Sequence, residues 1–369
     1  MLYQVRYSSR FPGSIPVSKT RFPAAAQQLH ADLRGNLLIK VLMSGYALRC
    51  MNHIRVTVEG GLNAALILYD LLGAERESLF AKGLCSGASV PVIHPTRARS
   101  ITAIAHSTEL PRESVRRFMV RLAATGWIEE ISPSRYRTTH RTRHWFALAD
   151  DASMLLEFIW ITSQIKAVLD AGEDDLAPLL ARHPWQVALA TQREGLVHPP
   201  PYLAAIPALQ DRLRAATPSE TEYLAHHVDG LMYRHLKACR QTFEDDLMLP
   251  ILIGEIAHRN IAQIARRDQV TPFLDCFHLH YQEQDSPESC LEYLLSNTYS
   301  LSLATGIPET TVRRKVALLV ERGWINQEVG GALSINNSAI LEHSTQLNAD
   351  FLADMLATYQ ALCALGFGI

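Results

Sequence analysis

The segment PRESVRRFMVRLAATGWI, residues 111–128, occurs a second time in altered form as PETTVRRKVALLVERGWI, residues 308–325. The two copies lie 197 positions apart and align without a gap. Eight of the eighteen positions are identical, too many for a chance likeness between two helices: Pro111/Pro308, Val115/Val312, Arg116/Arg313, Arg117/Arg314, Leu122/Leu319, Gly126/Gly323, Trp127/Trp324 and Ile128/Ile325. The chain therefore contains an internal repeat.

Each copy has the pattern of a helix that ends in a strand. Four apolar residues of the first copy fall on one helical face and are expected to pack inward: Val115, Phe118, Met119 and Leu122. The Gly-Trp-Ile ending predicts a glycine cap, a tryptophan that anchors the core, and a strand. A short helix and a tight turn are expected before each copy, and a strand, turn and strand after it. Helix, turn, helix and hairpin is the order of elements in a winged helix-turn-helix.

These residues resemble bacterial winged helix-turn-helix transcriptional regulators. The resemblance rests on Thr108 to Pro111 and Thr305 to Pro308 at the turn, on Val-Arg-Arg in the second helix, and on Gly-Trp-Ile after it. It covers only about a quarter of the chain. It implies a DNA-binding fold, while the function itself must be argued from the site.

The repeat extends upstream of this motif. Six residue pairs match at a constant offset of 185: Gly45/Gly230, Arg49/Arg234, Arg55/Arg240, Thr57/Thr242, Glu59/Glu244 and Leu62/Leu247. Because the offset grows from 185 to 197 before the motif, the second half carries twelve extra residues, which we place at 274–288. Whole halves of the chain are therefore duplicated.

We predict a mainly α-helical fold with small β-hairpin wings, in which two winged units form a tandem pseudo-two-fold repeat joined by long helices. Helices are expected at 24–58, 61–72, 155–169 and 348–365. The predicted organisation is an N-terminal arm at 1–26, a helical region at 27–97, the first winged domain at 98–150, a helical connector at 151–218, a helical region at 219–293, the second winged domain at 294–340 and a C-terminal helix at 341–369.

Composition excludes several classes of protein. With 48% hydrophobic and 20% charged residues in a chain of 369, we expect a soluble, cytoplasmic protein of two or three domains. The most apolar run, residues 247–257, is too short and interrupted to span a bilayer. The six cysteines include no Cys-x-x-Cys pair, which speaks against a zinc site or a disulfide framework. No phosphate loop, nucleophile elbow or metal-ligand pair is evident, so we expect neither an enzyme nor a cofactor.

Charge is distributed unequally between the two copies. Residues 97–144 hold ten arginines against four glutamates, a net charge of +6. Residues 294–341 hold three arginines and one lysine against three glutamates, a net charge of +1. The first copy is therefore the better candidate for contact with a polyanion.

Helical geometry then selects candidate DNA-binding residues. With Val115 inward, Glu113, Arg117 and Arg121 point outward, with Ser114 and Arg116 at the edges. Arg117 and Arg121 are expected to reach base edges, and Arg116 the backbone. The first copy also offers Arg112, and the end of its hairpin Arg135, Arg137, Arg141 and Arg143 for phosphates. The second copy offers Thr310, Thr311, Arg313 and Arg314, while Leu318 replaces Arg121 on what we expect to be its exposed face.

The leading hypothesis is a DNA-binding transcriptional regulator in which duplication within one chain imitates a two-fold dimer. Its partner is double-stranded DNA, contacted mainly by the first copy. The hypothesis leaves open a small-molecule effector held between the long helices and dimerisation on top of the internal pseudo-dimer. The alternative hypothesis is a winged-helix protein-interaction or assembly module that does not bind DNA. The uncharged second hairpin supports this alternative.

Overall fold

The protein is mainly helical, with two small antiparallel sheets. The computed structural model describes residues 33–80, 98–146, 153–170, 207–267 and 296–369. The predicted arm at 1–26 and the predicted insertion at 274–288 lie outside the described residues.

The first half begins with two helices, α2 (Leu33–Thr57) and α3 (Gly61–Phe80). A compact group of elements follows, which we call the first unit (residues 98–146). It contains β1 (Arg99–Ser100), α4 (Ile101–Thr108), α5 (Arg112–Ala124), β2 (Ile128–Ser132), β3 (Arg135–Thr138) and α6 (His140–Phe146). Its three strands pair in the order β1-β3-β2. Helix α7 (Ser153–Asp170) comes next.

The second half repeats this order, but among the described residues its unit has no counterpart of β1, and one helix takes the place of two. After α10 (Pro207–Arg214) come α11 (Pro218–Thr242) and α12 (Met248–Arg267). The second unit (residues 296–336) contains α14 (Thr298–Thr305), α15 (Glu309–Glu321), β4 (Ile325–Gln327) and β5 (Leu333–Ile335). Helix α16 (Asn337–Cys363) begins 197 positions after α6, and it continues as one helix where the first half has both α6 and α7. Helices α2 and α11 are both 25 residues long and begin 185 positions apart.

Two predicted helix boundaries were wrong, and one strand was not predicted. Helix α3 continues eight residues past the expected end at Leu72, because the buried Arg76 on its extension forms ion pairs with Glu222 and Asp229 of α11. Helix α16 begins at 337 rather than 348, and its added turns bury Ile340 and Leu347. Strand β1 was not expected, because two residues carry no periodicity. It is held by pairing with β3.

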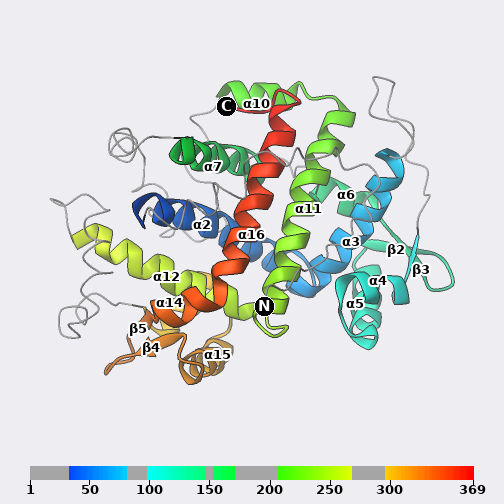
Figure 1. The fold of residues 1–369 in the computed structure, drawn as a ribbon. Helices are drawn as coiled ribbons and strands as arrows, with labels where there is room; N and C mark the ends of the chain where they lie inside the picture. The colour runs from blue at the N-terminus through cyan, green and yellow to red at the C-terminus, as the bar shows by residue number, and fades with distance from the viewer. Residues whose placement is uncertain (1–32, 81–97, 147–152, 171–206, 268–295) are drawn as a thin grey trace, which may run out of the picture.

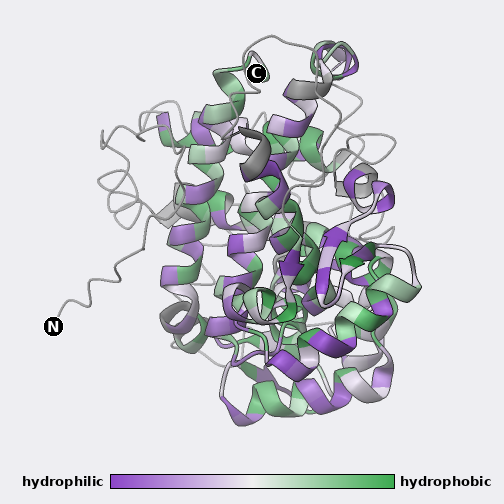
Figure 2. Cartoon of the chain, turned by 90° about the vertical axis from the view of Figure 1, so that its right-hand side faces the viewer, coloured by the Kyte–Doolittle hydropathy of each residue, from purple (hydrophilic) through white to green (hydrophobic). Residues whose placement is uncertain are grey.

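Each half of the chain packs a long helix against the other half. Helix α2 packs against α7 of its own half and against α12 of the other, while α11 packs against α16 of its own half and against α3 of the other. Figure 1 shows α11 and α16 side by side through the centre, with the first unit at lower right and the second at lower left. In Figure 2, green and purple alternate along the helices, as expected when one face of each is buried.

Among the described residues, no single helix is long and apolar enough to cross a membrane. The segments Leu42–Thr57 and Gly61–Glu77 reach that length and composition only when counted together, across a bend of 95°.

Local interactions explain how each unit turns from helix to hairpin. Gly126 and Gly323 follow the second helices with φ of 77° and 69°, a left-handed conformation that favours glycine. Trp127 and Trp324 are then buried, with 1% and 8% of their surfaces exposed. The predicted glycine caps and tryptophan anchors are confirmed.

Two histidines are buried between long helices, one at the boundary of the two halves and one within the second half. His258 of α12 hydrogen-bonds Ser44 of α2 at 2.8 Å, and His235 of α11 stacks on Phe351 of α16 with a centroid distance of 3.9 Å. Burial lowers the pKa of His258 from its usual 6.5 to about 3, and that of His235 to about 4. Both rings are therefore neutral in the folded protein.

We expect the folded state to lose stability as the pH falls below 6.5. A depressed folded-state pKa means that unfolding takes up protons between the folded and unfolded values, so the contribution is complete above pH 6.5. Each histidine should cost about 1.4 kcal/mol per pH unit, or roughly 3 kcal/mol for both between pH 7.5 and 5.5. Urea denaturation at the two pH values measures this. His258→Gln should reduce the dependence of the unfolding free energy on pH. His106 is exposed, and His106→Gln should leave that dependence unchanged.

Candidate nucleic-acid interface

The candidate DNA-binding residues lie on four elements. On α5 are Arg112, Glu113, Ser114, Arg116, Arg117 and Arg121; on β3 are Arg135 and Arg137; on α6 are Arg141 and Arg143; and on α15 are Thr310, Thr311, Arg313 and Arg314. The structure brings those of the first unit together around α5 and its hairpin, and places the α15 set in the second unit.

Helix α5 presents a basic outer face. Its inner face buries Val115, Met119 and Leu122, which fixes the opposite side toward solvent. Arg112, Arg117 and Arg121 are exposed and have no ion-pair partner among the described residues. These three guanidinium groups are therefore available to an external anion.

Arg116 differs from its neighbours on α5. It forms an exposed ion pair with Glu113 at 2.7 Å, one helical turn away. Hydrogen bonding from Arg116 lowers the pKa of Glu113, so the carboxylate offsets this guanidinium charge. Arg117 is placed differently, because its Nη2 lies 3.4 Å from the hydroxyl of Ser114, which is uncharged.

The hairpin of the first unit carries one paired and one unpaired arginine. On β3, Arg137 stands opposite Glu129 of β2 and forms an ion pair with it at 2.6 Å. Arg135 donates a hydrogen bond to the carbonyl of Ala98 at 3.2 Å and has no ion-pair partner among the described residues. Arg135 is therefore the stronger candidate for a phosphate contact.

The prediction that Arg141 and Arg143 sit at the end of the hairpin was wrong. Both lie on α6, because a helix begins at His140 directly after β3. The guanidinium of Arg141 stacks on Trp127 at 4.2 Å and donates to the carbonyl of Thr125. Arg143 donates to the carbonyls of Thr138 and Thr139, both at 3.4 Å. These side chains hold the unit together.

The second unit offers less free positive charge. Arg313 forms an ion pair with Glu309 at 2.6 Å, and Lys315 pairs with Asp246 in the turn before α12. Arg314 is exposed, and among the described residues it is the basic side chain of α15 without an ion-pair partner. Thr310 is exposed and Thr311 is half-buried.

The expected exposure of Leu318 was also wrong. This residue aligns with the exposed Arg121, but it is half-buried and packs against the core. The second unit exposes other apolar side chains, namely Val329 of its hairpin and, on α14, Tyr299 and Leu303, with 59% and 68% of their surfaces exposed. The aligned residues of α4 are the exposed Thr102 and His106. The outer faces of α4 and α14 therefore differ in apolar surface, although the first unit exposes Val120 and Ile131 elsewhere.

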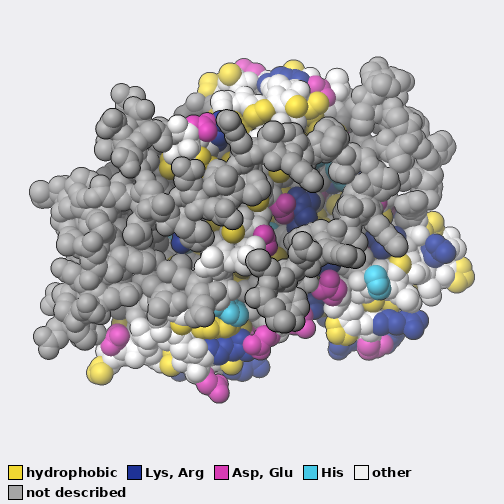
Figure 3. Space-filling view, viewed as in Figure 1, with side chains coloured by type: hydrophobic (Ala, Val, Ile, Leu, Met, Phe, Trp, Pro, Cys, Tyr) yellow, Lys and Arg dark blue, Asp and Glu magenta, His cyan; other side chains and the backbone are white. Residues whose placement is uncertain are grey.

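Both second helices lie at the same end of the molecule. In Figure 1, α5 and α15 are at the lower edge and α10 is at the opposite end. Figure 3 shows Lys and Arg side chains gathered along this lower edge over both units, mixed with acidic side chains. One extended ligand on this side could therefore meet both units.

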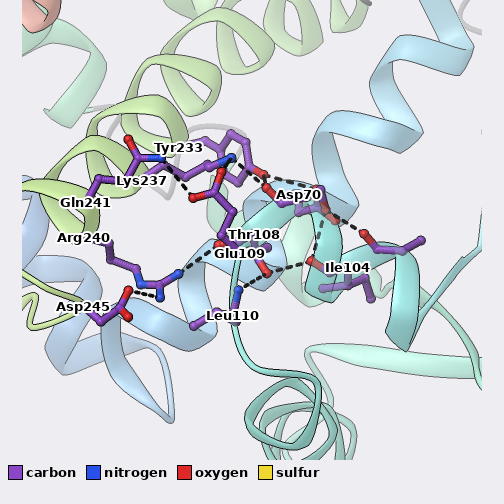
Figure 4. A network of polar contacts seen from close by, with 12 residues as sticks. Asp70, Ile104, Thr108, Glu109, Leu110, Tyr233, Lys237, Arg240, Gln241 and Asp245 are labelled. Atoms are coloured by element: carbon purple, nitrogen blue, oxygen red, sulfur yellow. Dashed lines mark hydrogen bonds and ion pairs between the residues drawn. The ribbon is translucent and has the colours of Figure 1, made fainter. Parts of the chain in front are cut away.

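Sequence reasoning missed the polar contacts that join α11 to the first unit (Figure 4). Arg240 of α11 donates to the carbonyl of Thr108 at 2.9 Å, and Arg55 of α2 donates to the carbonyl of Thr305 in the second unit. The two arginines are an aligned pair of the 185 offset, and the two threonines an aligned pair of the 197 offset. The matching positions of these arginines and threonines in the two halves were the sequence signal that could have predicted both contacts.

Comparisons with known proteins found no family model, no curated protein and no solved structure that matches this chain. Within the described residues, no cluster of three or more His, Cys, Asp or Glu could hold a metal ion.

Proposed function

We propose that the protein is a DNA-binding transcriptional regulator that carries an intramolecular pair of unequal winged helix-turn-helix units. The observation that carries this proposal is the outer face of α5, where Arg117 and Arg121 are exposed one helical turn apart without ion-pair partners among the described residues. A helix of this kind, followed by a hairpin, is the element that regulators of this class place in the major groove.

The two units are proposed to bind one duplex with different strengths. Helices α5 and α15 lie at the same end of the molecule, which suits simultaneous contact. The first unit would supply most base and phosphate contacts, and the second would add Arg314 with Thr310 and Thr311. Because the two faces differ chemically, the preferred DNA site would be asymmetric.

We expect DNA binding to weaken steeply with salt. Five exposed basic side chains have no ion-pair partner among the described residues: Arg112, Arg117, Arg121, Arg135 and Arg314. If each neutralises one phosphate, the log-log slope should be about −4.5, which is roughly a 500-fold loss of affinity between 50 and 200 mM salt. Fluorescence anisotropy with a labelled random duplex measures the slope. No binding at low salt would refute the proposal.

The second candidate function is a protein-interaction module, favoured by Tyr299 and Leu303. These side chains lie one turn apart on the outer face of α14, where the first unit has Thr102 and His106. A partner that binds this face would be lost on Leu303→Ser without any change in DNA affinity. A protein partner that stays bound to the chain when no DNA is present would distinguish this function from DNA binding.

A further inference from the structure

The turn between α4 and α5 is held by a helix from the other half of the chain. Four side chains of α11 face this turn at helical spacing, namely Tyr233, Lys237, Arg240 and Gln241 (Figure 4). Tyr233 and Lys237 donate to the carbonyl of Ser107 at 3.0 and 2.8 Å, and Arg240 donates to the carbonyl of Thr108. The last carbonyls of α4, which lack partners within a helix, are thereby satisfied.

Glu109 occupies a strained position in this turn. Its φ is 60°, in the left-handed region that a residue with a side chain adopts only at an energetic cost. The aligned residue of the second unit is Gly306, with a φ of 65°. Glycine would adopt this backbone conformation at position 109 at a lower energetic cost than glutamate. We therefore expect the Glu109 side chain to make a favourable contact that offsets this cost.

That favourable contact is with α11. The carboxylate of Glu109 lies 3.0 Å from Nζ of Lys237 and accepts a hydrogen bond from Gln241 at 2.9 Å. Partial burial alone would raise the pKa of Glu109, but hydrogen bonds from Gln241 and Lys237 outweigh it and lower the pKa. We call Glu109, Lys237 and Gln241 the α11 clamp.

The second unit lacks the counterpart of this clamp. At an offset of 185, Lys237 and Gln241 correspond to Asn52 and Val56 of α2, and Glu109 corresponds to Gly306. Among the described residues, the contact that the second unit retains is the arginine contact, from Arg55 to the carbonyl of Thr305. The more basic unit is therefore also the one with the additional attachment to the other half.

We propose that the α11 clamp sets the orientation of α5 relative to the other half, which makes Glu109, Lys237 and Gln241 positioning residues for DNA recognition. This proposal rests on the proposed function. Binding by a preoriented helix avoids the entropy cost of ordering it. If loss of the clamp leaves α5 correctly oriented a tenth of the time, the apparent Kd rises about tenfold.

The sign of the effect at Glu109 separates positioning from simple electrostatics. Glu109→Gly removes a negative charge from the first unit, so if Glu109 acted only through its charge, the substitution would strengthen DNA binding. A positioning residue would on replacement weaken it. Gln241→Val, which copies Val56, changes no charge and should also weaken binding. Glu109→Gln retains hydrogen bonding and should restore part of the affinity.

The experiment combines two measurements on the full chain. Hydrogen exchange without DNA should show faster exchange in residues 101–124 of Glu109→Gly and of Gln241→Val, with 298–321 unchanged. Anisotropy with a random duplex should show the rise in Kd, and Glu321→Gln, which removes an exposed acid from α15, should not raise it. Unchanged exchange, or tighter binding by Glu109→Gly, would overturn the clamp. Absence of DNA binding by the unaltered chain would instead refute the proposed function.

Discussion

Replacing Arg49 by alanine is expected to lower the free energy of unfolding by about 3–5 kcal/mol. Arg49 of α2 forms an ion pair with Glu157 of α7, and only 9% and 5% of the two side chains are exposed. Without Arg49, the carboxylate would stay buried and lose this charge partner. Urea denaturation at pH 7.5, monitored by circular dichroism, measures the loss.

The repeat supplies a matched control for this prediction. Arg234 and Asp354 occupy the positions of Arg49 and Glu157 in the second half, and they form an ion pair at 2.8 Å. Because 46% and 37% of these side chains are exposed, Arg234→Ala should cost less than about 1 kcal/mol. Equal losses in the two variants would mean that burial is not the cause. Replacing both members of the buried pair by apolar residues should recover much of the loss.

Local sequence patterns were sufficient to predict the elements around the repeated motif. The apolar spacing of Val115, Met119 and Leu122 predicts the buried face of α5, because a helix of 3.6 residues per turn aligns these positions. Gly126 and Trp127 predict the end of α5, because a left-handed glycine ends a helix locally and the buried tryptophan follows it directly. Such features depend on neighbours in sequence, which the chain displays directly.

The environment of the charged residues could not be predicted in the same way. Arg121 and Arg141 are both arginines of the first unit, yet Arg121 is free on α5 among the described residues while Arg141 stacks on Trp127. Arg49 and Arg234 are aligned by the repeat, yet only Arg49 is buried. These differences arise from contacts between residues far apart in sequence. A count of charged residues gives every one of these arginines the same charge and does not show which are paired or buried.

The two units are expected to differ most when the unpaired arginines of α5 are removed. Arg117→Ala/Arg121→Ala should raise the Kd for DNA by roughly 30-fold to 20,000-fold, because each arginine in contact with a base edge contributes about 1–3 kcal/mol. Arg313→Ala/Arg314→Ala in the second unit should have a much smaller effect, because Arg313 is already paired with Glu309. Anisotropy at a fixed, low salt concentration measures both variants.

A control at the other end of the molecule distinguishes local contact from overall charge. Lys166→Ala/Arg214→Ala also removes two positive charges, one from α7 and one from α10, where each is paired with an aspartate. In Figure 1 these helices lie away from the edge that carries α5 and α15. Since long-range attraction is screened within about 10 Å at 0.1 M salt, this variant should bind DNA nearly as well as the unaltered chain. A loss equal to that of Arg117→Ala/Arg121→Ala would show that DNA responds to net charge rather than to the face of α5.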